Sequence, residues 1–118
     1  MRSLIWEEGA KDLGCVYHKK AIVRRLNESR QVDVFVQRGS SRGIAITINR
    51  YVNGVEIAKR QLGIPDPLQD GLVIQGVSTA FNELGWDPEA SAYAAGEVAD
   101  LLKRDEPLIR TALKEIEG

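Results

Sequence analysis

Residues 44–56 read Ile-Ala-Ile-Thr-Ile-Asn-Arg-Tyr-Val-Asn-Gly-Val-Glu. At the start of this stretch isoleucines occupy every second position, and a period of two is typical of a half-buried β-strand. Asn53-Gly54 then interrupts the pattern between two valines. An Asn-Gly pair favours a two-residue type I′ turn, because both central positions of that turn need a positive φ. The stretch therefore predicts a strand over 44–52 that returns, antiparallel, over 55–62.

A two-residue loop also fixes the register of this hairpin. The expected pairs are Val52 with Val55, Tyr51 with Glu56, Asn49 with Ala58 and Thr47 with Arg60. One face of the hairpin is then apolar, and we expect it to line the core: Ile44, Ile46, Ile48, Val52, Val55 and Ile57. The opposite face is mostly polar and carries Thr47, Asn49, Tyr51, Glu56 and Arg60.

Two earlier segments extend the sheet. Residues 32–36 alternate valine with Asp33 and Phe35, which places Phe35 on the mostly polar face. Another strand is expected within 15–26, before the polar turn 27–30, and Lys19-Lys20 is a point at which it divides into two pieces. Residues 3–7 are a candidate edge strand. Together these segments predict a four- or five-stranded antiparallel β-meander.

The pattern changes to a helical period after residue 64. Asp66 and Pro67 are suited to the N-cap and first position of a helix over 66–84, and Gly85 is a stop signal. Asp87-Pro88 repeats the start signal for a helical region over 88–116, in which Pro107 either kinks one helix or starts another. The sequence therefore predicts one α+β domain, 1–118, in which two or three C-terminal helices follow the meander.

Charge is divided between the two halves of the chain. Residues 1–63 contain 12 Lys/Arg and six Asp/Glu, a charge of +6, whereas residues 64–118 contain four and 11, a charge of −7. Such an asymmetry favours an anionic partner for the basic, sheet-forming half. The alternative is that a basic and an acidic face of one domain attract each other.

The residues of catalysis are scarce. The single cysteine, Cys15, excludes an internal disulfide, and the single histidine, His18, excludes a zinc site built from several imidazoles. His18 has no nucleophile near it in sequence, and neither standard phosphate-binding glycine loop is present. We therefore expect a non-enzymatic protein without a cofactor or metal. No stretch has the length of a membrane span or a signal peptide, so a cytoplasmic protein without membrane contact is expected.

The first functional hypothesis is a binding protein for single-stranded nucleic acid or a nucleotide. Phe35 and Tyr51 would stack on bases, and Arg38, Arg42 and Arg60 would contact phosphate. The alternatives are that residues 38–43 form a plain hairpin loop, and that the N-terminal segment folds over the two rings. The whole-chain pI of about 5.9 is low for a nucleic-acid-binding domain.

The second hypothesis is a protein-interaction module: a small adaptor, inhibitor or assembly subunit that acts through its helical face. One helix suffices to cover a small sheet, so the apolar stripe of residues 93–116 is expected to seek a partner. We expect this stripe to hold a homo-oligomer, with Leu101 inside the contact.

Overall fold

The computed structural model describes residues 4–11, 14–38, 43–64 and 70–117. Five strands form one antiparallel sheet, in which each strand lies beside the next in sequence. The strands are β1 (Glu7–Glu8), β2 (Cys15–Arg25), β3 (Glu28–Gln37), β4 (Ile44–Val52) and β5 (Val55–Ile64). The helices are α1 (Asp70–Glu83), α2 (Pro88–Arg104) and α3 (Glu106–Glu117). The predicted α+β class, a meander followed by C-terminal helices, is confirmed.

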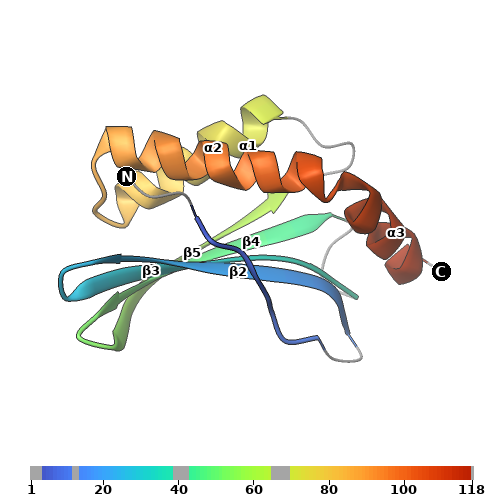
Figure 1. Cartoon of the computed structure of the whole chain (residues 1–118), viewed down its shortest axis with the longest axis horizontal. Coiled ribbons are helices and arrows are strands. Elements are labelled where there is room, and N and C mark those ends of the chain that lie inside the picture. Colours follow the sequence, from blue (N-terminus) through green and yellow to red (C-terminus); the bar gives the residue numbers. More distant parts are fainter. Residues whose placement is uncertain (1–3, 12–13, 39–42, 65–69, 118) are drawn as a thin grey trace.

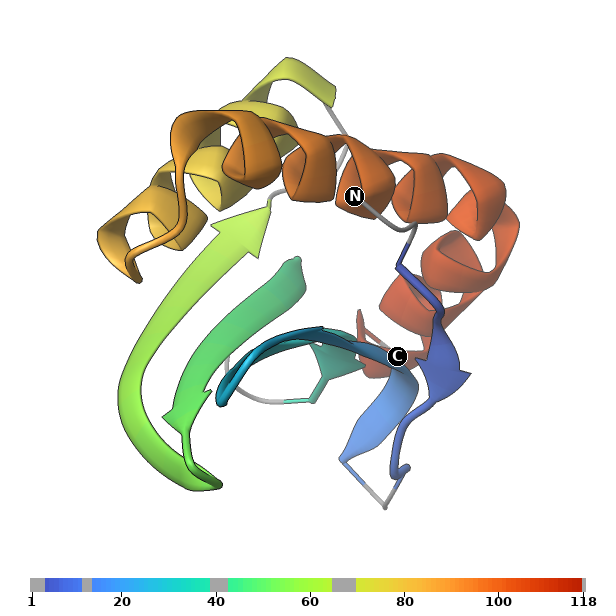
Figure 2. The same cartoon turned by 60° about the vertical axis from the view of Figure 1, so that its left-hand side comes forward.

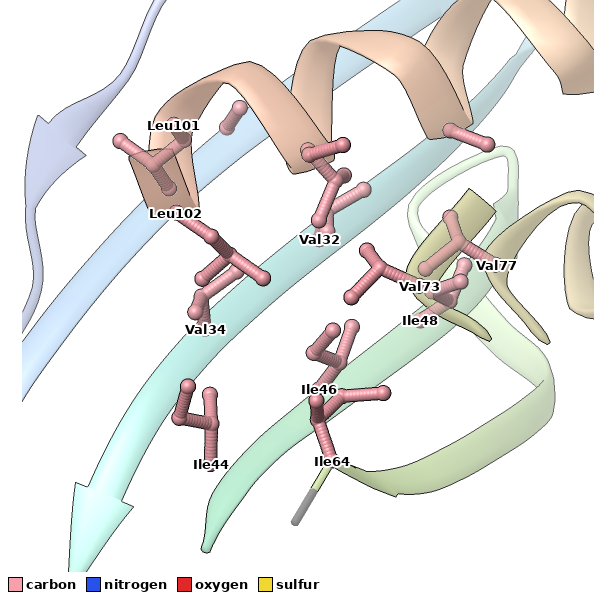
Figure 3. Packing of buried hydrophobic residues seen from close by; sticks show 14 of the residues in the cluster. Val32, Val34, Ile44, Ile46, Ile48, Ile64, Val73, Val77, Leu101 and Leu102 are labelled. Carbon is pink, nitrogen blue, oxygen red and sulfur yellow. The ribbon is translucent and has the colours of Figure 1, made fainter. Parts of the chain in front are cut away.

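The helices form one layer over the sheet, with α2 running along it and α3 turning down at the end of the chain (Figure 1). Figure 2 shows that the sheet is strongly curved and that the helices lie on its concave side. The core fills the space between the two layers (Figure 3). As expected, Ile44, Ile46 and Ile48 face it and are fully buried. They meet valines of β3, Val73 and Val77 of α1, and Leu101 and Leu102 of α2.

The β4–β5 hairpin has the predicted turn. Asn53 and Gly54 have φ values of 50° and 80°, as a type I′ turn requires. Val52 pairs with Val55, and Tyr51 pairs with Glu56. Beyond these two pairs the predicted register is wrong by one residue.

A β-bulge at Ile57 causes this shift, because Arg50 pairs with Ala58 while Tyr51 pairs with Glu56. Asn49 consequently lies opposite Lys59 instead of Ala58, and Thr47 lies opposite Gln61 instead of Arg60. An extra residue reverses the faces of the strand beyond it. Arg60 therefore moves from the outer, convex face of the sheet to the side of the helices.

Val55 and Ile57 do not join the core, contrary to expectation. Their side chains are 63% and 52% exposed. Both residues lie close to the β4–β5 turn, and Figure 2 shows this turn at an end of the curved sheet away from the helices. The helices therefore cover the isoleucines of β4 but do not reach this end of β5.

The N-terminal half of the sheet also differs from expectation. Lys19-Lys20 does not divide the second strand, since β2 is continuous from Cys15 to Arg25. The two lysines pair with Glu8 and Glu7 of β1, which is the edge strand expected near residues 3–7. Leu4, just before β1, is buried in the core instead of lying over the outer face.

The helix signals hold where the structure describes them. Gly85 has a φ of 92° after α1, and the carboxylate of Asp87 accepts the backbone N–H of Ala90 as the N-cap of α2. Asp105 separates α2 from α3, so Pro107 lies in the first turn of a third helix. The predicted cap at Asp66 and Pro67 lies outside the described residues. No helix in the described ranges is long and apolar enough to cross a membrane.

The apolar stripe of residues 93–116 is largely covered within the chain. Val98 and Ile109 are fully buried, and Leu101 is 1% exposed, against the sheet and the other helices. Tyr93 and Leu108 remain exposed, and the homo-oligomer through this stripe stays a prediction. We now expect Leu101→Asp to unfold the protein rather than to separate subunits, because it would bury an unpaired carboxylate.

One buried hydrogen bond joins β2 to the junction of α2 and α3. The hydroxyl of Tyr17 donates to Oδ2 of Asp105 over 2.8 Å, and both residues are buried. Burial, together with the adjacent carboxylate, raises the pKa of Tyr17 above its ordinary value. The phenol therefore stays protonated and remains a donor across the neutral range.

Tyr17→Phe should lower the free energy of unfolding by about 1–3 kcal/mol, because it leaves the buried carboxylate of Asp105 without its phenol donor. Urea denaturation followed by far-ultraviolet circular dichroism measures the change. Tyr51→Phe, on the outer face of the sheet, is the control and should have a smaller effect. Equal losses for the two variants would contradict a structural role for the Tyr17–Asp105 bond.

Candidate functional site

The two aromatic residues expected to stack on a ligand lie on the outer face but far apart. Phe35 pairs with Ala45, whereas Tyr51 pairs with Ser29. Tyr51 lies six positions after Ala45 in β4, which corresponds to about 20 Å along the strand. Phe35 instead contacts the ring of His18 edge-to-face, with a centroid distance of 5.9 Å. The N-terminal segment does not cover Tyr51 and Phe35 as a pair, since Leu4 enters the core on the other face.

The arginines expected to bind phosphate do not gather around these rings. Nη1 of Arg38 donates to the backbone carbonyl of Glu115 in α3 over 3.0 Å. Nε of Arg60 donates to Glu83 in α1 over 3.0 Å, on the side to which the bulge turns it. Arg42 lies outside the described residues. The four described members of the predicted site therefore do not form one binding surface.

Several basic side chains of the sheet half bind acidic groups of the same chain. Arg25 and Arg60 form ion pairs with Asp87 and Glu83 of the acidic half, over 3.4 Å and 3.0 Å. Within the basic half, Lys19 pairs with Glu8. These contacts correspond to the alternative explanation of the divided charge, in which the two halves attract each other.

A pocket of about 750 Å³ opens where the N-terminal segment, the end of β2 and the start of α2 meet. We call it the β2–α2 pocket. Its walls combine apolar and charged residues: Leu4, Ile5, Ile22, Val23, Arg24, Arg25, Trp86, Asp87, Glu89, Ala90 and Tyr93. Ile5 is 79% exposed and Ile22 is 42% exposed, so apolar surface remains at the pocket although the core lies beside it. The volume of this pocket lies within the range of ligand sites.

The edge of β2 is open beside this pocket. The backbone N–H of Gly9 donates to the carbonyl of His18 over 2.9 Å, which shows that the backbone groups of His18 point away from β3. In an antiparallel pair this direction recurs at every second residue, so Ile22 and Arg24 also present their backbone groups to this edge. β1 pairs only with Lys19 and Lys20. In the described ranges no strand pairs with the edge at residues 22–24.

The charges at the pocket have both signs. Arg24 and Arg25 come from β2, and Asp87 and Glu89 come from the start of α2. The N–H of Ala90 holds the pKa of Asp87 below its ordinary value, and Arg25 contributes in the same direction. Arg25 forms an ion pair with Asp87. Arg24, the other cation of the pocket, forms no ion pair with a described residue.

The ring of Trp86 packs against Arg30. Arg30, Glu28 and Arg50 form a group of charged residues, here called the Arg30 cluster. Arg30 is 0% exposed, and its guanidinium carbon lies 5.2 Å from the centre of the Trp86 ring. Nη2 of Arg30 donates to the carbonyl of Leu84 at the end of α1 over 2.5 Å. Nη1 donates to Oε2 of Glu28 over 3.0 Å, and Arg50 donates to the other oxygen of Glu28.

The titration behaviour of the Arg30 cluster follows from these contacts. Hydrogen bonds from Arg50 and Arg30 hold the pKa of Glu28 below its ordinary value. Burial lowers the pKa of Arg30, but guanidinium remains charged in proteins. The Nε groups of both arginines and Nε1 of Trp86 are buried without an acceptor in the described part of the chain.

Neither the β2–α2 pocket nor the Arg30 cluster was predicted from the sequence. One signal for Arg30 was present, since it has the same parity as Val32, Val34 and Val36 and therefore belongs to the core face of its strand. Trp86 precedes the cap residue Asp87, but the sequence does not indicate what the ring contacts. The pocket depends on where the N-terminal segment crosses β2, which is a tertiary feature.

The comparison with known proteins gives no relative from which a function could be inferred. No protein-family model, no curated protein and no solved structure matches this chain. The open edge of β2 and the pocket beside it are therefore interpreted from their own chemistry.

The Arg30 cluster predicts an acid-sensitive contribution to stability. Because the folded protein lowers the pKa of Glu28, its carboxylate stabilises the fold above the ordinary titration range of glutamate. This contribution is lost as the pH falls through the lowered pKa. Between about pH 6 and pH 3, the Tm of Glu28→Gln should therefore fall less steeply than that of the wild type.

Differential scanning calorimetry at several pH values tests this expectation. At neutral pH Glu28→Gln should be less stable than the wild type, because it removes the carboxylate that bridges Arg30 and Arg50. Glu106→Gln, at an exposed i,i+4 pair with Arg110, is the control and should retain the pH dependence of the wild type. Parallel pH profiles for Glu28→Gln and the wild type would contradict the role of the carboxylate.

Proposed function

We propose that this protein is a non-enzymatic protein-interaction module that binds an extended segment of a partner protein along the open edge of β2. The observation that carries the proposal is that no strand of the described ranges pairs with residues 22–24 of β2, and that the β2–α2 pocket lies beside this edge. Addition of a strand to a sheet edge is a recurring mode of peptide recognition, in which main-chain hydrogen bonds supply affinity and pockets for alternate side chains supply specificity.

The geometry indicates which side chains such a segment would carry. Residues of the partner opposite Ile22 and Arg24 would lie on the outer face of the sheet, because strand neighbours in register share a face. The partner residue between them would point to the side of the helices, toward Val23, Trp86 and Tyr93. An apolar side chain suits that position, since these three residues are themselves mainly apolar.

Charge favours an acidic residue next to this apolar one. On the outer face Lys20 and Arg24 flank Ile22, and Arg24 is exposed. A carboxylate opposite Arg24 would form a cross-strand ion pair of the kind that contributes to sheet pairing. We therefore propose that the partner segment alternates apolar and acidic residues.

This function fits the distribution of basic residues better than nucleic-acid binding does. Arg38 and Arg60 are engaged with α3 and α1, and Phe35 and Tyr51 lie at opposite ends of the outer face. Single-strand binders combine aromatic platforms with a continuous basic groove. Binding of single-stranded nucleic acid or a nucleotide stays a prediction, and it forms a separate arm of the experiment below.

Fluorescence anisotropy with a labelled peptide of about ten residues, alternating valine and glutamate, tests the proposal. The wild type should bind this peptide more tightly than a peptide that alternates valine and lysine. Ile22→Pro should weaken binding by about tenfold or more, because it removes an outward N–H and places a ring in the path of the added strand. Proline is tolerated there within the sheet, since that N–H does not pair with β3.

Lys59→Pro is the matched control, because it changes an outward position at the opposite edge of the sheet and should leave peptide binding unchanged. Circular dichroism and thermal melting check that both proline variants are folded. Absence of peptide binding up to about 1 mM would contradict the proposal. Binding of a labelled single-stranded oligonucleotide that Ile22→Pro does not affect would instead favour the nucleic-acid hypothesis.

A further inference from the structure

The second edge of the sheet, strand β5, carries exposed apolar side chains together with charges of both signs. In the described ranges β5 pairs with β4 alone, and the residues near the turn are exposed, whereas Arg60 and Leu62 farther along the strand lie close to α1. Val55 and Ile57 are mostly exposed on β5. Exposed apolar side chains on an edge strand favour association with another strand. This edge is separate from the β2–α2 pocket and plays no part in the proposed function.

The register of β5 shows which residues present their backbone groups to a partner. Val52 and Val55 close a two-residue hairpin, so they form a hydrogen-bonded pair, and Glu56 next to them points outward. The bulge at Ile57 changes the spacing, so the next outward residue is Lys59, opposite Asn49. Gln61 and Gly63 follow. Glu56 and Lys59 both carry their side chains on the outer face.

A second copy of β5 fits this edge in one charge-complementary register. Antiparallel pairing about a two-fold axis places outward residues opposite outward residues. A register centred on Lys59 would set the two lysines opposite each other, which is unfavourable. A register centred between Ile57 and Ala58 instead sets Glu56 opposite Lys59 of the second copy, and the symmetry repeats this pair.

We propose that this protein forms a homodimer in which β5 pairs antiparallel with β5 of a second copy, in the register that joins Glu56 to Lys59. The same register sets Ile57 against Ala58 of the second copy and brings Val55 alongside the partner strand. One oxygen of Glu56 accepts a hydrogen bond from Asn49, and the other faces the incoming lysine. The dimer continues the sheet across the axis and leaves the stripe of residues 93–116 within each core.

Charge reversal tests the register. Sedimentation velocity between about 10 µM and about 1 mM, where a contact of this small size is expected to associate, should show a concentration-dependent dimer for the wild type. Glu56→Lys and Lys59→Glu should each raise the dimer Kd by about tenfold or more, because each turns two attractive pairs into repulsive ones. The double reversal, Glu56→Lys with Lys59→Glu, should restore dimerisation.

The folding controls are circular dichroism and thermal melting of every variant, because Glu56→Lys also removes the bond from Asn49. Lys59→Glu keeps that bond, so it tests the register even where Glu56→Lys is destabilised. Lys59→Pro should abolish the dimer while Ile22→Pro should not. A wild type that is monomeric over the whole range would overturn the proposal. A folded Lys59→Glu variant that dimerises as the wild type does would also overturn it.

Discussion

The fully buried guanidinium of Arg30 joins the sheet to the segment that connects the first two helices. Arg30 projects from β3, the middle strand of the sheet, to the connection between α1 and α2, where it contacts the carbonyl of Leu84 and the ring of Trp86. The carbonyl of Leu84 lies at the negative end of the α1 dipole, where a cation is favoured. Glu28 supplies the counter-charge from the same strand. Loss of Glu28 would leave the fully buried guanidinium of Arg30 without this counter-charge, which is destabilising.

The candidate binding surface is a consequence of this constraint. The ring of Trp86 packs on Phe81 at a centroid distance of 5.1 Å and under Arg30, so its position is fixed from two sides. The next residue, Asp87, begins α2 and pairs with Arg25 of β2. These contacts hold α2 above the end of β2 while the N-terminal segment leaves the strand at β1. The space that remains between them is the β2–α2 pocket.

The sequence was informative where local chemistry decides the structure. Asn53-Gly54, Gly85 and Asp87 each need a particular backbone conformation or supply a particular cap, so the hairpin and helix boundaries could be predicted. The bulge at Ile57 was not predicted, because residues 55–62 contain no glycine or proline, and the adjacent apolar residues Ile57 and Ala58 do not by themselves identify an extra residue. That single residue turned Arg60 away from Tyr51, while the distance between Phe35 and Tyr51 follows from the β3–β4 register. The hydrogen bond of Arg38 could not be predicted from the sequence either, since its partner Glu115 lies 77 positions away in the chain.

The close fit around Gly85 has a consequence for ancestry. A Cβ atom at this position would lie 3.2 Å from Nη1 of Arg50 and 3.4 Å from Nη2 of Arg30, and the φ of 92° is itself unsuited to other residues. The two arginines face each other across β3 and β4, so the loop between these strands can change in length without parting them. A divergent homologue is therefore recognisable less by overall identity than by a covarying set: two arginines and a glutamate on the sheet, and a Gly-Trp pair directly after the first helix.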